Sequence, residues 1–350
     1  MAPKARAWGY KRYDYAEARP KSLVFGVIPA VEFHLTVFWN VFFFLRRQAG
    51  EFFLFNVVPR IERVESKRRQ RTLARQVDVA GFGHWSGQDV VYSFRPAPEN
   101  SGVRFFRVDL PNSEPIPALV ENRVATPRQT SLVVGEARVD MVEHALAALR
   151  GARIDNCDVL ANAVGAPGLD GSGAPFVDAF LKAGTVEQEA ERVLLRVVSA
   201  GTFFDERGGR IEVAPSEENR LIYEYRLHYD KASPIPNQVA RFDFAQAPEI
   251  FQREIAPCRT FLTFEEAIGL RNMGFGLRLE PKDVLVFGEN GPIDNALKFE
   301  NECARHKILD MIGDFSLAPV DWEGEFRAFK TGHQQNADAL RALMNSVDIR

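Results

Sequence analysis

The sequence is poor in the residue types that would assign it to several common classes of protein. Only three of its 350 residues are cysteine, too few and too scattered for a disulfide framework, and an odd number suits a reducing compartment. A formal net charge of −3 gives no excess of positive charge for binding nucleic acid. The Gly-rich stretch 168–173 lacks the GxxxxGK[ST] spacing of a phosphate-binding loop. We therefore expect a cytoplasmic protein that binds no nucleic acid.

Histidine is also scarce, with six residues, and three of them lie in segments suited to metal or proton chemistry. His144 follows Glu143, His306 precedes Asp310 by one helical turn, and His333 ends a short Lys-Thr-Gly-His segment. These three histidines are the first candidates for a functional site.

The segment 302–315 is predicted to be a helix, in which residues i, i+4 and i+8 lie almost above one another. His306, Asp310 and Asp314 would form a stripe on one face, which is the arrangement of half a metal site. Imidazole and carboxylate suit zinc, which in catalytic sites takes three protein ligands and keeps one position for water. A histidine and a carboxylate one turn apart also occur as a solvated pair, so the spacing alone leaves both interpretations open.

A third ligand must come from another segment, and the best candidate is the Ala- and Leu-rich segment 142–149. Its composition predicts a helix. Adjacent helical residues point about 100° apart, so His144 could bind the metal while Glu143 reaches its water.

A series of short stretches carries a family resemblance by its order along the chain. They are Gln70-Arg71-Thr72, Gly81-Phe82-Gly83, Ser86-Gly87, Arg95-Pro96-Ala97-Pro98-Glu99-Asn100-Ser101-Gly102, Val142-Glu143-His144, Ala147-Ala148-Leu149, Ile154-Asp155-Asn156, Asp170-Gly171-Ser172, Ala174-Pro175-Phe176, Arg259-Thr260-Phe261, Arg305-His306-Lys307-Ile308-Leu309-Asp310, Ile312-Gly313-Asp314 and Gly332-His333. No single stretch is decisive, but their ordered combination is highly specific. From about Arg69 to Met344 the chain resembles the bacterial zinc-dependent UDP-3-O-acyl-N-acetylglucosamine deacetylases, which catalyse the committed step of lipid A synthesis.

The resemblance implies a role for each residue that matches a functional position of the family. It implies zinc held by His144, His306 and Asp310, with the water that completes the site as the nucleophile. The implied roles of the other residues are proton acceptor for Glu143, oxyanion donor for the Thr260 hydroxyl, added positive charge for Lys307, and general acid for His333, which Asp314 holds as imidazolium.

The resemblance also implies the fold class, an α+β sandwich of two domains of similar plan with zinc between them. We expect the first domain at residues 69–190 and the second at 191–350, after a charged link at 187–192. An insert at about 262–288 would form a hydrophobic passage for the substrate's acyl chain, with Phe261, Met273, Phe275 and Leu277 as substrate contacts. Ordinary core packing is the alternative for these apolar residues.

One motif departs from the family pattern. Where the family has Gly-Val-Gly-Leu-His-Ser-Gly, this chain has Gly81-Phe82-Gly83-His84-Trp85-Ser86-Gly87, which moves the histidine back by one position. One step reverses the side-chain direction in an extended segment, so we expect that His84 does not replace the family's histidine.

Residues 1–68 lie outside the resemblance and form an extension of doubtful structure. The apolar run from Leu23 to Leu45 is long enough to span a bilayer, but Pro29, Glu32 and Asn40 interrupt it. We favour a wrongly extended start, with the native protein beginning near residue 68. A segment that lies on the membrane surface is the second interpretation.

These features together predict a zinc-dependent hydrolase that removes acetate from UDP-3-O-acyl-N-acetylglucosamine and acts as a monomer. One alternative is a zinc deacetylase of another N-acetylated nucleotide sugar, since Leu262 and Thr263 replace the family's Gly-Phe near the pocket. The other is a catalytically silent protein that binds nucleotide sugar or lipid. Packing alone requires none of six polar residues, which are Glu143, His144, Thr260, His306, Asp310 and His333. Their presence together argues against a catalytically silent protein.

Overall fold

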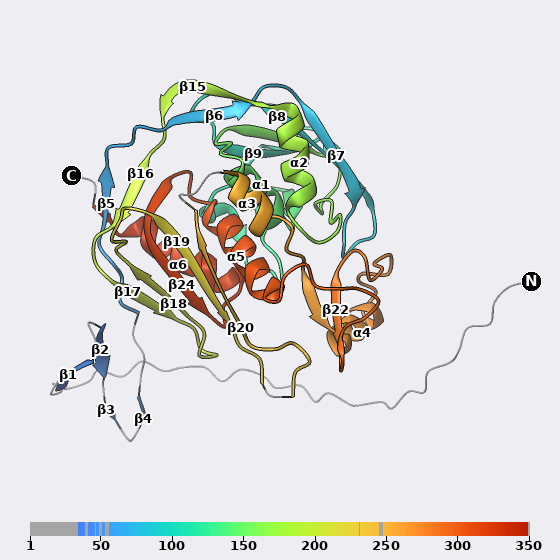
Figure 1. Ribbon diagram of the computed structural model, residues 1–350. Helices are drawn as coiled ribbons and strands as arrows, with labels where there is room; N and C mark the ends of the chain where they lie inside the picture. Colours follow the sequence, from blue (N-terminus) through green and yellow to red (C-terminus); the bar gives the residue numbers. More distant parts are fainter. Residues whose placement is uncertain are drawn as a thin grey trace, which may run out of the picture.

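The computed structural model describes residues 56–230, 232–244 and 248–348, together with the backbone of four short strands between residues 34 and 52. The predicted α+β class is confirmed. Two sheets lie on the outside, and helices α1 (Glu143–Gly151) and α5 (Glu302–Phe315) pack against each other between them (Figure 1). The molecule is therefore a sandwich in the order sheet, helices, sheet.

The first sheet has five strands in the order β10-β9-β14-β8-β7, and α1 and α2 (Ala174–Ala183) lie beside it. The ring of Phe94 packs edge-on against Phe176 and Phe180 of α2, at centroid distances of 5.9 and 4.9 Å. A three-stranded antiparallel sheet follows the short helix η1 (Val120–Asn122). The strands are β7 (Val77–Phe82), β8 (Asp89–Pro96), β9 (Val103–Arg107), β10 (Ile116–Pro117), β11 (Arg123–Val124), β12 (Ser131–Val134), β13 (Ala137–Asp140) and β14 (Cys157–Ala161).

The second sheet has eight strands and is built around β24 (Asp321–Phe329), which pairs in parallel with both β16 and β19. Its inner face packs on α5 and α6 (His333–Asn345), for example through Phe315 and Phe326, whose ring centroids are 5.1 Å apart. The other strands are β5 (Ile61–Val64), β16 (Leu194–Val197), β17 (Gly201–Phe204), β18 (Arg210–Ala214), β19 (Leu221–Leu227), β20 (Gln238–Asp243) and β25 (Val347–Asp348).

Helices α1 and α5 lie in close contact at Gly313. A Cβ atom added there would lie 2.1 Å from the carbonyl oxygen of Glu143, at the start of α1. All residues of α1 except Arg150 are buried, and three of them are alanine, so the helix fits between α5 and the first sheet. The contact brings the first turn of α1 against the last two turns of α5.

Most of the charged link expected at 187–192 forms a strand. Strand β15 (Thr185–Glu191) occupies it and pairs antiparallel, with a bulge, with β6 (Arg69–Leu73). Most of its side chains are at least partly exposed, which is why a strand of this two-stranded ribbon can carry a run of charges. The chain crosses between the two halves of the sandwich at the ends of this ribbon.

Residues 56–68, which the sequence places in the N-terminal extension, contribute to the second sheet. Strand β5 pairs with β16 and β25, and the side chain of Ile61 is fully buried. The apolar run 23–45 lies mostly outside the described residues; its described parts, β1 (His34–Phe38) and β2 (Val41–Leu45), pair antiparallel. Two further short strands are β3 (Arg47–Gln48) and β4 (Glu51–Phe52). No helix in the described part of the chain has the length and hydropathy needed to cross a bilayer.

The segment after Thr260 forms a small β-α-β unit at the side of the sandwich, where Figure 1 shows α4 and β22. Strands β21 (Phe261–Thr263) and β22 (Leu285–Gly288) are parallel, and β23 (Gly291–Pro292) extends the sheet. A capping box, in which Thr263 and Glu266 bond each other's backbone N–H groups, starts helix α4 (Phe264–Asn272). The short helix α3 (Pro248–Glu254) precedes the unit and packs on α1.

We expect Gly313→Ala to lower the free energy of unfolding by about 1–3 kcal/mol, because its methyl group would press on the backbone of Glu143. Gly269→Ala in α4 is the matched control, since a Cβ there meets nothing within 4 Å and alanine favours helix by about 1 kcal/mol. Denaturant unfolding of both variants measures the difference. Equal effects of the two substitutions would contradict the close packing of α1 on α5.

Candidate metal centre and catalytic residues

The contact between α1 and α5 brings together two histidines and one carboxylate. The nearest ligand atoms of His144, His306 and Asp310 all lie within 4.8 Å of one another, and all three side chains are buried. Asp310 Oδ1 is 3.5 Å from His144 Nε2 and 3.4 Å from His306 Nε2. The two imidazole rings meet edge to face, with centroids 5.0 Å apart. This is the only such group of potential ligands in the part of the chain that the structure describes.

Hydrogen bonds outside the group fix which ligand atoms face inward. His306 Nδ1 donates to the carbonyl oxygen of Cys258 at 3.0 Å, which leaves the Nε2 lone pair directed at the centre. Burial lowers the pKa of His306 to about 4, so its ring is neutral at pH 7. Burial alone would raise the pKa of Asp310, but Lys307, whose Nζ donates to Oδ2 at 2.7 Å, holds it well below its usual range. A neutral imidazole and an ionised carboxylate are the forms that bind metal.

Charged side chains surround this group. Three buried carboxylates, those of Glu143, Asp310 and Asp314, face Lys307 and protonated His333, and buried Arg123 also acts electrostatically on Glu143 and Asp314. The chemistry of the donor atoms, more than the charge count, therefore indicates what this group could bind. The donor set of two imidazole nitrogens and one carboxylate oxygen matches three-ligand catalytic zinc sites. The residues present therefore fit a divalent ion of this kind.

Glu143 lies at the start of α1, beside the ligand group. Its Oε2 accepts a hydrogen bond of 2.9 Å from the backbone N–H of Thr130, while Oε1 is 3.9 Å from His333 Nε2. The side chain is 2% exposed, and burial raises its pKa. One carboxylate oxygen is thus held in place, and a raised pKa makes the group a better proton acceptor.

His333 opens helix α6 and faces the same centre. Its Nδ1 donates to Asp314 Oδ2 at 2.9 Å, and its Nε2 lies 3.9 Å from Asp310 Oδ2. Burial alone would lower its pKa, but Asp314, Glu143 and Asp310 outweigh burial and raise it to about 9. The ring is therefore an imidazolium at pH 7, with the Nε2 proton directed at the centre.

Thr260, Phe261 and Lys307 complete the surroundings of the ligand group. The Thr260 hydroxyl lies 3.3 Å from His306 Nε2 and donates to the Gly171 carbonyl at 3.1 Å. The ring centroid of Phe261 is 6.0 Å from that of His306. All the residues that the sequence nominates for metal binding or proton transfer thus lie around one centre. Asp314 belongs to the predicted helix stripe, but it contacts His333 and not the metal ligands.

The three other nominated substrate contacts lie on the small β-α-β unit. Met273, Phe275 and Leu277 are 65%, 46% and 62% exposed, and no residue of α4 is buried. Ordinary core packing is therefore excluded for these three side chains.

His84 is buried in a tight loop of the first half. A Cβ on Gly168 would lie 1.7 Å from the His84 ring, and the ring Nε2 is 3.4 Å from the Leu169 carbonyl. Burial lowers the pKa of His84 to about 4. The structure thus gives His84 a packing role against this glycine.

Two polar residues of the centre are not predicted by the sequence. The Thr130 hydroxyl donates to Asp314 Oδ1 at 2.5 Å, and Asn336 Nδ2 donates to Asp314 Oδ2 at 2.8 Å. Thr130 therefore holds the carboxylates of both Glu143 and Asp314. The only signal for Asn336 is its position three residues after His333, on the same side of a predicted helix. No local pattern marks Thr130.

Comparison with known proteins agrees with this geometry. Residues 70–345 match the family described as UDP-3-O-acyl N-acetylglycosamine deacetylase, LpxC. The chain is also similar to the "Bifunctional enzyme LpxC/FabZ" of Chlorobaculum tepidum, with 31% identity over 307 residues, which are 80% of this chain and 65% of that protein. The chain thus spans slightly less than two thirds of the length of this relative. Because the family match covers residues 70–345, the protein belongs to the UDP-3-O-acyl N-acetylglycosamine deacetylase family.

Proposed function

We propose that this protein is a zinc-dependent hydrolase that removes acetate from UDP-3-O-acyl-N-acetylglucosamine, the committed step of lipid A biosynthesis. The observation that carries the proposal is the buried group of His144, His306 and Asp310, flanked by a carboxylate with a raised pKa and by an imidazolium. Amide hydrolysis needs a proton acceptor on one side of the reacting carbon and a proton donor for the leaving amine. The arrangement supplies both within one cluster.

His144, His306 and Asp310 would hold the zinc ion. When bound, the ion supplies Lewis-acid chemistry, polarising a carbonyl oxygen and lowering the pKa of a water from about 15.7 towards about 7. Asp310 fits this role because Lys307 keeps it ionised, and His306 fits because Cys258 fixes its tautomer.

Glu143 takes the proton from the attacking water. Its Oε2 is held by Thr130, so Oε1 is the atom that receives the proton. Once protonated, the buried carboxyl is stable because burial already favours its neutral form.

His333 gives its Nε2 proton to the nitrogen of the leaving amine. Asp314 accepts the hydrogen bond from His333 Nδ1–H throughout and so keeps the ring oriented. The carboxyl oxygens of Asp314 are themselves held by Thr130 and Asn336, which limits the motion of the donor.

Thr260 and Lys307 stabilise the negative charge that develops on the acetyl oxygen. The Thr260 hydroxyl needs only to rotate away from the Gly171 carbonyl to donate to an oxygen near His306 Nε2. Lys307 adds a positive charge that is fixed in place by its ion pair with Asp310.

The exposed apolar residues of the β-α-β unit bind the acyl chain, and Phe261 connects them to the centre. Met273, Phe275 and Leu277 form an exposed apolar surface, as a site for a hydrocarbon requires. Each methylene removed from water contributes about 0.8 kcal/mol, so a long acyl chain supplies a large part of the affinity.

The proposal also covers the domain organisation of the protein and its location in the cell. We assign residues 69–190 and 191–350 to two domains, with β5 added to the second by its pairing with β16. Three buried, unpaired cysteines suit a monomer in the cytoplasm.

We expect the full-length protein to release acetate from UDP-3-O-acyl-N-acetylglucosamine, to lose this activity with a chelator, and to regain it with zinc. His144→Ala should bind less zinc, while His228→Ala, which changes an exposed histidine, should bind as much as the parent. Acetate assays and metal analysis measure the two quantities. Activity that survives complete metal removal would contradict the proposal. One bound zinc without acetate release would indicate another N-acylated nucleotide sugar.

Glu143→Gln and His333→Gln should each lower kcat by roughly 10² to 10⁴, the usual size of an acid or base effect. Glu136→Gln, at an exposed site, is the control for the first substitution, and His228→Gln for the second.

The general acid must carry its proton, so kcat/KM should fall as pH rises through the pKa of His333. A divalent ion nearby would repel that proton, which places the fall at or below about pH 9. A profile of His333→Gln that retains the parent's alkaline limb would assign the limb to another group.

Leu277→Ala and Met273→Ala should lower kcat/KM for a long-chain substrate by about four- to sixtyfold, the equivalent of one to three methylenes. They should leave the rate with a short-chain analogue unchanged. Val108→Ala, which shortens another exposed apolar side chain, is the control. Equal losses with both chain lengths would mean that these residues affect the fold and not acyl recognition.

A further inference from the structure

A cavity of about 210 Å³ lies against the C-terminal half of α1, separate from the metal-ligand group at the start of that helix. Its walls come from the beginning of β9, from residues 117–119 and from the loop after α5. None of the residues proposed for catalysis lines it. The cavity is therefore separate from the proposed active site.

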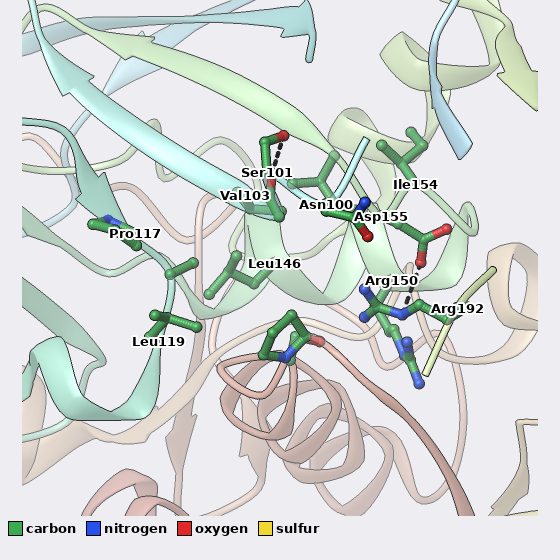
Figure 2. A pocket seen from close by; sticks show the side chains of 15 residues that line it. Asn100, Ser101, Val103, Pro117, Leu119, Leu146, Arg150, Ile154, Asp155 and Arg192 are labelled. Carbon is green, nitrogen blue, oxygen red and sulfur yellow. Dashed lines mark hydrogen bonds and ion pairs between the residues drawn. The ribbon is translucent and has the colours of Figure 1, made fainter. Parts of the chain in front are cut away.

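Most of the wall is apolar, with cations at one end only. Figure 2 shows Leu119, Leu146 and Pro117 on one side and Arg150, Arg192 and Asp155 on the other. Ser101 also lines the cavity, but its hydroxyl already donates to the Pro98 carbonyl at 2.7 Å. The lining thus offers hydrocarbon along its length and hydrogen-bond donors at one end.

Arg192 is a donor with unused bonding capacity. The residue is 8% exposed, and its Nε lies 3.2 Å from Asp155 Oδ1 and 3.4 Å from Asp321 Oδ1. Its two terminal nitrogens make no hydrogen bond to any of the described residues. Arg68, in contrast, donates four hydrogen bonds from its three side-chain nitrogens to the same two carboxylates, at 2.7 to 3.0 Å.

The surroundings hold more positive than negative charge. Four arginines, at positions 68, 150, 153 and 192, interact with only two carboxylates, Asp155 and Asp321. Burial lowers the pKa of Arg192 and of Arg153 to about 10, so these cations are not fully compensated, although they remain charged at pH 7. One more anion beside Arg192 would relieve this excess.

We propose that this cavity binds a small carboxylate with a short apolar tail. The carboxylate accepts hydrogen bonds from the free nitrogens of Arg192, and the tail lies along Leu119, Leu146 and Leu149. A cavity of about 150 Å³ holds benzene, with six heavy atoms, so 210 Å³ holds about eight, the number in hexanoate. Bare phosphate would leave the apolar wall empty, and a neutral hydrocarbon would leave Arg192 uncompensated.

The position of the cavity gives the ligand an effect on the whole sandwich. Arg68 precedes β6 and Arg192 follows β15, so both lie where the chain crosses between the two halves. Arg150 and Asp155 belong to the first half, and Asp321 begins the central strand of the second. A bound anion beside Arg192 adds to the network that joins the halves and so stabilises the folded protein.

Calorimetric titration of the zinc-loaded full-length protein with hexanoate tests the proposal. We expect one binding site, a rise in melting temperature with hexanoate concentration, and binding at least tenfold weaker for hexylamine, acetate and inorganic phosphate. Tight binding of hexylamine would overturn the role of Arg192, and tight binding of phosphate would overturn the role of the apolar wall.

Three substitutions locate the site. Arg192→Met should weaken hexanoate binding about ten- to hundredfold, the worth of hydrogen bonds to a charged group. Arg196→Met, which removes a cation of β16 outside the cavity, should not change it. Leu119→Trp fills the cavity and keeps every charge, so it should abolish binding even if Arg192→Met does not fold. Retention of binding in Leu119→Trp, or its loss in Leu277→Ala on the exposed β-α-β unit, would overturn the proposal.

Discussion

The close approach of α1 to α5 at Gly313 is the constraint on which the candidate site depends. Because this glycine has no side chain, the backbone of Glu143 can lie directly against α5. The next residue of α1 is His144, and the preceding turns of α5 carry Asp310 and His306. A side chain at 313 would separate the helices and with them the three ligand atoms that now lie within 4.8 Å.

The two ends of α1 lie in different electrostatic surroundings. Glu143 at its N-terminus and Arg150 near its C-terminus both suit the helix dipole. Around Glu143 the carboxylates of Asp310 and Asp314 are offset by Lys307, protonated His333 and Arg123. Around Arg150 the arginines outnumber the carboxylates. An uncompensated buried charge is costly, so the C-terminal end of the helix gains more from a ligand of opposite sign.

The sequence predicts those parts of the structure that depend on local periodicity. Helix α5 spans the predicted residues, and its 3.6-residue period is enough to align His306, Asp310 and Asp314. Thr130 is 184 residues away from Asp314, and only packing brings the two together. Strand β15 also depends on a distant partner, since its pairing with β6 spans more than 110 residues. Its own sequence therefore indicates only a charged link. Ile61 is buried for a similar reason, since β5 belongs to a sheet whose other strands begin at residue 194.

Residues 258–261 connect the candidate metal centre to the β-α-β unit over a short stretch of chain. The Cys258 carbonyl orients His306, Arg259 forms a buried ion pair with Glu302 at the first turn of α5, and the Thr260 hydroxyl lies beside His306 Nε2. The next residue, Phe261, starts the β-α-β unit. Arg259 ties this segment to α5, so a shift of the unit relative to the ligand group would break a buried charge pair. Under the proposed function, this tie would let binding energy from an apolar tail on the unit help to position the amide at the centre.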